Sequence, residues 1–264
     1  MFDEHLARWG LIPDGEPITT HSSRLLPVLW GGEPAMLKVA HAPEERAGAR
    51  LMAWWAGEGA ARVLAHAGDA LLLERATGAG SLAEMARGGR DDQATRILCA
   101  AAARLHAPRD RPTPELVPLA RWFRALEPAA AAHGGTLLRS LQAARELLAD
   151  PRDVTVLHGD LHHGNVLDFG ARGWLAIDPK GLMGERTFDF ANLFLNPEPR
   201  IALAPGRLAR QVDVVADAAM VECGRLLRWI VAWSGLSAAW SLEDGDDPAF
   251  AVAVAEVAAS VLYR

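Results

Sequence analysis

The chain has 264 residues and a mass of 28.3 kDa, a size that suits one large domain or two small ones. Its 27 basic and 33 acidic residues give a formal net charge of −6, which argues against nucleic acid as a partner. The acidic first residues do not resemble a signal peptide, and no apolar stretch reaches membrane-spanning length. Cys99 and Cys223 are expected to be free thiols, as in a reducing compartment. We therefore expect a cytoplasmic protein with no membrane partner.

The basic residues are almost all arginines. Only two of the 27 are lysines, Lys38 and Lys180. A GC-rich genome would explain the preference for arginine and the abundance of alanine. It would not explain why these two lysines were kept.

The first part of the chain predicts a small sheet. Runs of strand-forming residues separated by turn residues give four extended segments: 18–30, 35–39, 60–65 and 70–73. Gly31-Gly32 is a hairpin-type turn between the first two. A helix is expected to begin at Pro43 and to run to about Trp55, because proline and acids favour the first helical turn.

The rest of the chain is predicted to be mainly helical. Thr77 to Gly80 is a flexible boundary, and Asp91 could cap the helix that follows it. Further helices are expected near 115–131, at 136–149 and from 207 onward, with short extended runs at 154–157, 166–167 and 174–177. The last two runs flank Gly170 to Gly173 as a hairpin. This order predicts an α+β fold with a sheet-rich lobe at 1–76 and a helical lobe at 77–264.

The segment from His158 to Asn165 carries the strongest chemical signal. His158-Gly159-Asp160 follows an apolar run, and Asn165 stands five positions after Asp160. This is the spacing of the kinase catalytic loop, in which the aspartate orients or deprotonates the attacking hydroxyl and the asparagine binds magnesium. We predict that Asp160 is catalytic and that Asn165 is a metal ligand.

A second acid is needed to hold magnesium on the nucleotide phosphates. The literal triplet Asp168-Phe169-Gly170 comes too early, on the first arm of the predicted hairpin. Asp178 follows the second arm, which returns the chain toward Asn165. We therefore predict Asp178 as the principal magnesium ligand and Asp168 as a turn residue.

The nucleotide phosphates also need a cation. Lys38 lies on a predicted strand, as does the lysine that touches phosphates in kinases. Glu45, one turn ahead of the apolar helix face, is predicted to hold it. No glycine-rich loop precedes Lys38, so Ser22 and Ser23 are the candidates for phosphate contact. Lys180, two residues after Asp178, could meet phosphate or substrate, and its role stays open.

The His-Gly-Asp form of the loop, its extra histidines and the Ile177-Asp178 pair resemble the aminoglycoside phosphotransferase family. The segments 173–179, 184–192 and 236–240 are similar to the streptomycin 6-phosphotransferases among the aminoglycoside and hydroxyurea resistance kinases. The resemblance spans nearly the whole chain. It implies a protein-kinase-like fold, the use of ATP and Mg²⁺, and phosphorylation of the streptidine 6-hydroxyl of streptomycin, which confers antibiotic resistance. It also implies that the backbone of Glu74 and Ala76 binds adenine.

A streptomycin-like substrate is cationic, so acids near the acceptor hydroxyl would favour it. Glu185 is the first candidate and the acidic run 243–247 the second, while Trp240 could form a wall of the pocket. In the same family pattern, Asp189 is a buried acid that bonds the catalytic loop. Its alternative role is a helix N-cap. A monomer or weak oligomer is expected.

Other functions fit parts of the same pattern. The acceptor could be hydroxyurea, a sugar or an amino alcohol. His158, Asp160, His162 and His163 could instead form a metal-dependent phosphohydrolase site, although histidines on a loop more often pack within it. A pseudokinase that only binds nucleotide is the third possibility.

Overall fold

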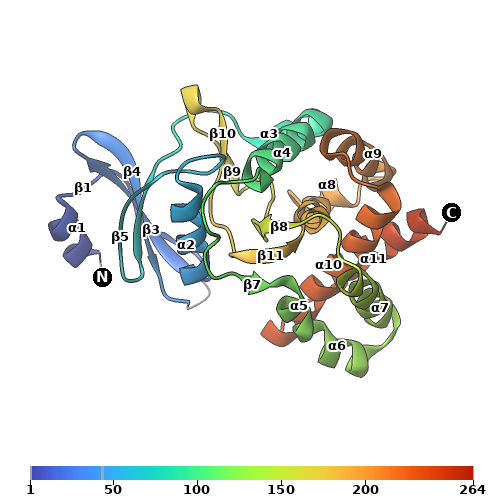
Figure 1. The fold of residues 1–264 in the computed structure, drawn as a ribbon. Helices are drawn as coiled ribbons and strands as arrows, with labels where there is room; N and C mark the ends of the chain where they lie inside the picture. Colours follow the sequence, from blue (N-terminus) through green and yellow to red (C-terminus); the bar gives the residue numbers. More distant parts are fainter. Residues whose placement is uncertain (1, 43–44, 264) are drawn as a thin grey trace.

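The structure is a computed structural model that describes residues 2–42 and 45–263. A twisted antiparallel sheet and two helices form the N-terminal part, and a larger helical part follows it (Figure 1). The elements of the first part are α1 (Asp3–Trp9), β1 (Ile12–Pro13), β2 (Ile18–Thr19), β3 (Ser23–Trp30), β4 (Glu33–Ala40), α2 (Glu45–Trp55), β5 (Val63–Ala67) and β6 (Ala70–Glu74). The strand order is β1-β3-β4-β6-β5, and β2 pairs with the outer side of β3.

The predicted hairpin between the first two long strands is confirmed. Gly31 and Gly32 have φ angles of 59° and 88°, and Trp30 pairs with Glu33 across the turn. A two-residue turn with positive φ at both positions matches the twist of the flanking strands, and glycine adopts it without steric cost. This register places Lys38 in the middle of the sheet, opposite Leu25 and Leu71.

The predicted strand at 60–65 is shifted toward the C-terminus in the structure. Ala60 and Ala61 are fully buried, and the backbone of Ala61 bonds Ala176 of the helical part. They join the two parts of the molecule, so β5 begins only at Val63. The predicted helix start at Pro43 lies outside the described residues, and α2 is seen from Glu45 onward.

The second part of the chain is built around the long helix α10. Its helices are α3 (Leu82–Arg87), α4 (Asp91–His106), α5 (Leu119–Trp122), α6 (Leu126–His133), α7 (Gly135–Ala149), α8 (Pro199–Ala202), α9 (Arg207–Ala219), α10 (Cys223–Asp244) and α11 (Ala249–Leu262). The short strands are β7 (Val117–Pro118), β8 (Val154–Leu157), β9 (Val166–Asp168), β10 (Trp174–Ala176) and β11 (Leu182–Glu185). Three 3-10 segments complete it: η1 (Phe123–Ala125), η2 (Gly170–Arg172) and η3 (Arg186–Leu195).

Two sequence predictions in this part were wrong. The helix expected near 115–131 is broken into α5, η1 and α6, after a short strand that ends at Pro118. Asp91 does not cap α4, because its carboxylate forms a buried ion pair with Arg207 of α9, 2.7 Å away. The β9–β10 hairpin was predicted correctly.

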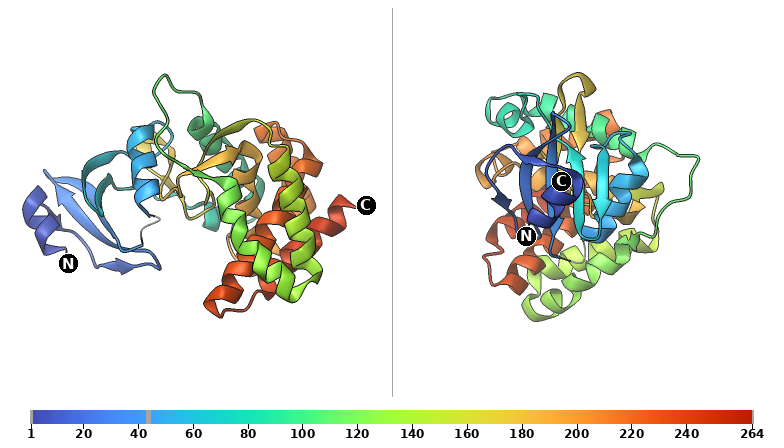
Figure 2. Two further views of the ribbon diagram at one scale, coloured as in Figure 1. Left: turned by 60° about the horizontal axis from the view of Figure 1, so that its bottom comes forward. Right: turned by 90° about the vertical axis from the view of Figure 1, so that its left-hand side faces the viewer.

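One large apolar core joins α2 to the helical part, and a smaller cluster lies on the side of the sheet where α1 packs. The N-terminus and C-terminus lie at opposite ends of the molecule, as Figure 2 shows. Within the part of the chain that the structure describes, every helix is too short or too polar to span a bilayer.

Candidate active site

A cavity of about 380 Å³ lies where the sheet meets the β9–β10 hairpin. Its walls are mostly apolar and include Leu25, Met36, Leu71 and Leu167. Charged and polar groups gather within it: Lys38, Glu45, Asn165 and Asp178. An apolar cavity that also contains charged groups suits a purine ring and its phosphates.

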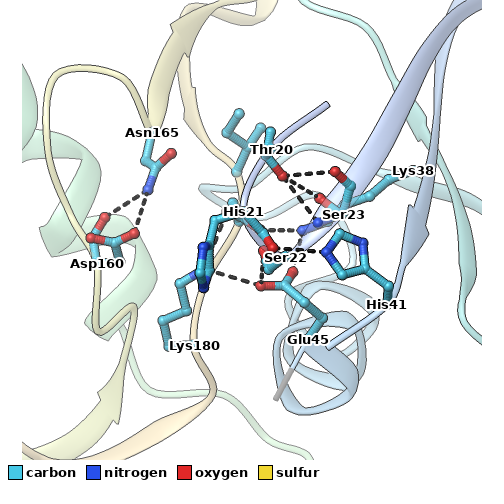
Figure 3. A network of polar contacts seen from close by, with 12 residues as sticks. Thr20, His21, Ser22, Ser23, Lys38, His41, Glu45, Asp160, Asn165 and Lys180 are labelled. Carbon is cyan, nitrogen blue, oxygen red and sulfur yellow. Dashed lines mark hydrogen bonds and ion pairs between the residues drawn. The ribbon is translucent and has the colours of Figure 1, made fainter. Parts of the chain in front are cut away.

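Lys38, Glu45 and Asp178, which line this cavity, form a closed set of two lysines and two carboxylates with Lys180. Lys38 contacts both Glu45 and Asp178. The Lys180 Nζ atom lies 3.3 Å from Glu45 Oε1 and 3.2 Å from Asp178 Oδ2. Figure 3 shows Lys180 reaching Glu45 from the side of Asp160 and Asn165, with Lys38 on the other side. Each carboxylate therefore gives one oxygen to each lysine.

The charges in this set support one another. Burial alone would raise the pKa of Asp178, but the ammonium groups of Lys38 and Lys180 hold that pKa well below its usual range. Burial alone would lower the pKa of Lys180, but Asp178, Glu45 and Asp160 raise it above its ordinary value. Asp178 is thus an anion, and Lys180 a cation, at neutral pH.

Two glycines allow helix α2 to approach this set. A Cβ at Gly48 would lie 2.0 Å from the carbonyl oxygen of Pro179, and one at Gly181 would lie 2.8 Å from Ala47. Gly181 also has a φ of 67°, which glycine adopts most readily. The close contact brings Glu45, in the first turn of α2, next to the segment that carries Asp178 and Lys180.

The Asp160 carboxylate lies at the edge of the site and is held by two asparagines. Asn165 Nδ2 donates to the Asp160 carbonyl at 2.9 Å and to Oδ2 at 3.1 Å. Asn192 Nδ2 donates to Oδ1 at 2.8 Å. Because the Asn165 amide nitrogen is committed in this way, its oxygen is left as an acceptor. Asn165 and Asp178 present the oxygen ligands that magnesium prefers.

The catalytic loop is held in place by Asp189, a buried residue that is 1% exposed. Its two oxygens accept the backbone N–H groups of His158 and Gly159 at 2.9 and 2.8 Å, and His106 bonds it as well. This agrees with the buried-acid alternative for Asp189 and not with an N-cap. Burial alone would raise the pKa of Asp189, yet the His106 bond and these donors lower it.

His158 is a structural residue. The ring is fully buried, its Nδ1 accepts from the Asp160 N–H at 3.2 Å, and its Nε2 lies 2.8 Å from the Ile177 carbonyl. The first bond requires an unprotonated Nδ1, so Nε2 carries the hydrogen. Burial lowers the pKa of His158, which keeps the ring neutral.

Asp168 is a turn residue, as the sequence predicted. Its Oδ1 accepts from Gly170 N–H in the hairpin at 2.9 Å. Its Oδ2 accepts from Gly80 N–H at 3.0 Å, which ties the hairpin to the segment after β6. Both carboxylate oxygens are used in this way, so the Asp168-Phe169-Gly170 triplet does not supply the acid of the charged set.

The predicted phosphate and adenine contacts are only partly placed at the cavity. Ser23 lines it, together with Thr20, but the Ser22 hydroxyl turns away to Glu45 Oε1 at 2.9 Å. Glu74 and Ala76 line the other end. The Glu74 N–H already donates to the Arg62 carbonyl at 3.0 Å, so this group is not available to adenine.

The structure contradicts the placement of Glu185 in a substrate pocket, whereas Trp240 as a pocket wall stays a prediction. Glu185 is 1% exposed and pairs with Arg225 at 2.6 Å, and it also accepts from Trp229 Nε1. Trp240 packs edge-on against Trp122 and Trp233. Glu185 is therefore structural, and Trp240 is partly exposed beside these rings. Residues 243–247 are all solvent-exposed.

The histidines do not form a metal centre. His163 is 3% exposed and packed near Arg207, and burial lowers its pKa to about 4. Among residues 2–42 and 45–263, no group of three or more His, Cys, Asp or Glu side chains is arranged to hold a metal ion. This geometry disfavours the phosphohydrolase alternative.

The site has four parts: a lysine on a strand, a glutamate on a helix, an Asp–Asn pair in the catalytic loop and a second aspartate after a hairpin. This combination defines a protein-kinase-like phosphotransferase. A family model described as aminoglycoside/hydroxyurea antibiotic resistance kinase matches residues 8–245. The chain belongs to this family.

Curated relatives and solved structures agree with this assignment. The chain is 58% identical over 245 residues to a streptomycin 3''-kinase of Klebsiella pneumoniae, covering 91% of this chain and 92% of the relative. It is 31% identical over 264 residues to a streptomycin 6-kinase of Streptomyces griseus, covering 90% and 81%. A crystal structure of the aminoglycoside phosphotransferase APH(4)-Ia is similar with a TM-score of 0.71 and 17% identity, covering 97% and 96%. The predicted fold class and family are thus confirmed.

Sequence reasoning missed Asn192 and left Lys180 open. Asn192 ends the segment 184–192 that carries the family resemblance, but no spacing rule connects it to Asp160. Lys180 carried one available signal, its rarity, since it is one of two lysines in the chain. The structure places the two lysines together.

Proposed function

We propose that this protein is an ATP-dependent O-phosphotransferase that modifies streptomycin. The observation that carries the proposal is the convergence of Lys38, Glu45, Asp178 and Asn165 on one cavity. Asp160 lies next to them, bonded to Asn165. The printed names of the two curated relatives support streptomycin as the acceptor. The chain's acidic balance suits a cationic substrate, although it does not select one.

The chemistry follows from the positions of the side chains. Asp160 accepts the proton of the acceptor hydroxyl, whose oxygen attacks the γ-phosphorus of ATP. The bond from that phosphorus to the β–γ bridging oxygen breaks, and its electron pair leaves with ADP. Lys38, held by Glu45, binds the phosphates. Asn165 and Asp178 would hold Mg²⁺, which neutralises phosphate charge. Positioning and charge stabilisation account for most of the acceleration in such transfers.

The proposal has two forms, which differ in the hydroxyl of streptomycin that is phosphorylated. The relative at 58% identity is a 3''-kinase, which favours the 3''-hydroxyl. The 6-hydroxyl expected from the sequence motifs is supported by the relative at 31% identity. We propose the 3''-hydroxyl first, because the higher identity extends over nearly the whole of both chains.

The test is a phosphorylation assay with streptomycin, hydroxyurea, a simple sugar and an amino alcohol as acceptors. We expect ATP-dependent product only with streptomycin, and NMR of that product identifies the modified hydroxyl. Phosphate release that needs no acceptor would support a hydrolase instead. Nucleotide binding with no turnover on any acceptor would support a pseudokinase.

A matched pair of variants tests the catalytic assignment. Asp160→Asn should lower kcat by about 10²- to 10⁴-fold, the range for loss of a general base. Asp168→Asn, at the literal triplet, should retain near-normal turnover because that acid serves the hairpin turn. Near-normal turnover by Asp160→Asn would show that the assignment is wrong.

A further inference from the structure

Lys180 lies between the two halves of the proposed active site. Its backbone N–H donates to the His158 carbonyl at 2.7 Å, which fixes it to the strand that leads into the catalytic loop. Its side chain crosses to Glu45 on helix α2 and is 21% exposed. Figure 3 shows that Lys180 is the lysine of the set on the side of Asp160 and Asn165, which is the acceptor side of the proposed site.

Lys180 supplies the second positive charge next to the two carboxylates. Lys38 already contacts both Glu45 and Asp178, so each acid would keep one ionic contact without Lys180. The two lysines lie on different sides of Glu45, with Lys180 on the side of Asp160 and Asn165 (Figure 3). A polyanion that enters the cavity can therefore meet a cation from each side.

We propose that Lys180 is a catalytic residue that contacts the terminal, transferred phosphate of the nucleotide. This inference rests on the proposed kinase function. Lys38 projects from the sheet and binds the phosphates that stay with ADP, whereas Lys180 projects from the catalytic-loop side and faces the phosphate that leaves. During transfer the bridging oxygen keeps the electron pair of the broken bond, and Asp160 takes the hydroxyl proton. A fixed ammonium beside the moving phosphoryl group stabilises its equatorial oxygens throughout.

The assignment predicts different nucleotide affinities for variants of the two lysines. Lys180→Met should weaken binding of a non-hydrolysable ATP analogue by at least about tenfold, the worth of one charge-assisted contact. It should leave ADP binding within about twofold of wild type, because ADP lacks the terminal phosphate. Lys38→Met should weaken both nucleotides. Arg50→Met, which removes an exposed positive charge from α2, should change neither.

The experiment measures both dissociation constants by calorimetry, and kcat with streptomycin, for the folded holoenzyme and each variant. We expect Lys180→Met to lose about a hundredfold in kcat, with Lys180→Arg intermediate because its planar fork differs from a point charge. Equal weakening of ADP and the ATP analogue would overturn the assignment and leave a structural lysine. A kcat within about threefold of wild type would also overturn it.

The nucleotide measurements separate this inference from the proposed function. If wild type binds nucleotide but phosphorylates no acceptor, the function fails and the affinity ratio still decides the place of Lys180. If wild type binds neither nucleotide, the proposed function is refuted and the assignment of Lys180 is refuted with it.

Discussion

Asn192 is predicted to set the orientation of the Asp160 carboxylate. Its Nδ2 donates to Asp160 Oδ1 at 2.8 Å. Its Oδ1 accepts from Trp233 Nε1 at 3.1 Å and from Asn196 Nδ2 at 3.2 Å. Two donors on the oxygen leave the amide only one orientation, with its nitrogen toward Asp160. Asn192 is therefore a positioning residue that acts through the catalytic aspartate, Asp160.

The structure gives the size of the expected effect. Asn192→Ala removes a hydrogen bond to a charged group, which is worth about 1.5–3 kcal/mol. If that bond matters mainly for the reacting geometry, kcat falls about 10- to 100-fold. The Trp233 indole, 5% exposed, also loses its acceptor. We expect this loss to lower the free energy of unfolding by about 1–3 kcal/mol.

The assay compares wild type, Asn192→Ala, Trp233→Phe and the double variant, with kcat and both KM values measured for each. We expect KM for ATP to stay unchanged, because Asn192 is not part of the cavity wall. Trp233→Phe should lower kcat less than Asn192→Ala does. It should have no further effect on kcat in the Asn192→Ala background, because both changes act along one chain of contacts.

Two results would refute this reasoning. One is a kcat for Asn192→Ala within about threefold of wild type. The other is full additivity of the two substitutions in kcat, which would mean that Trp233 does not act through Asn192. A thermal melt of each variant separates loss of fold from loss of rate.

Three further predictions follow from buried groups. Glu185→Ala should lower the free energy of unfolding by about 3–5 kcal/mol, because it removes the buried carboxylate partner of Arg225, which is 7% exposed, and leaves it only the contacts with Asp150; a raised KM for streptomycin with normal stability would instead restore Glu185 as a substrate contact. Gly48→Ala should lower kcat/KM for ATP about a hundredfold, since a Cβ 2.0 Å from the Pro179 oxygen forces α2 away from the charged set; Ala53→Ser, on the exposed side of α2, is the control, and equal activity of the two variants would contradict the packing argument. A thiol reagent at pH 8 should modify the exposed Cys223 in the native protein and Cys99 only after denaturation, because burial raises the pKa of Cys99 to about 12; two fast-reacting thiols in the native state would be the contrary result.

The parts of the fold and site that the sequence predicted are local. Gly31-Gly32 and the glycines around 170–173 mark hairpins because the turn geometry itself demands these residues. The choice of Asp178 over Asp168 followed from the same local logic, since a hairpin returns the chain to its starting point. The structure places Asp178, and not Asp168, in the charged set.

The parts that failed depend on contacts between distant segments. Asp91 is a residue type typical of an N-cap, but here it pairs with Arg207, which lies 116 residues away in the sequence. Ala60 and Ala61 begin a segment that was predicted to be a strand, but the Ala61 backbone bonds Ala176 of the helical part instead. Secondary-structure propensity describes which structures a segment can form, and tertiary packing decides which of them it adopts.

Exposure separates the acids that can act from those that hold the structure. Glu185 and Asp189 are each 1% exposed, and both of their oxygens are occupied by donors within the protein. Asp160 and Asp178 keep side-chain exposures of 27% and 29% at the site, in positions where a ligand can compete for their oxygens. Burying an ionised carboxylate is costly unless donors surround it, so a fully buried acid uses its hydrogen bonds to hold the fold. The sequence shows an acidic residue in all four places. Only the burial of each carboxylate distinguishes the two acids that can meet a substrate from the two that cannot.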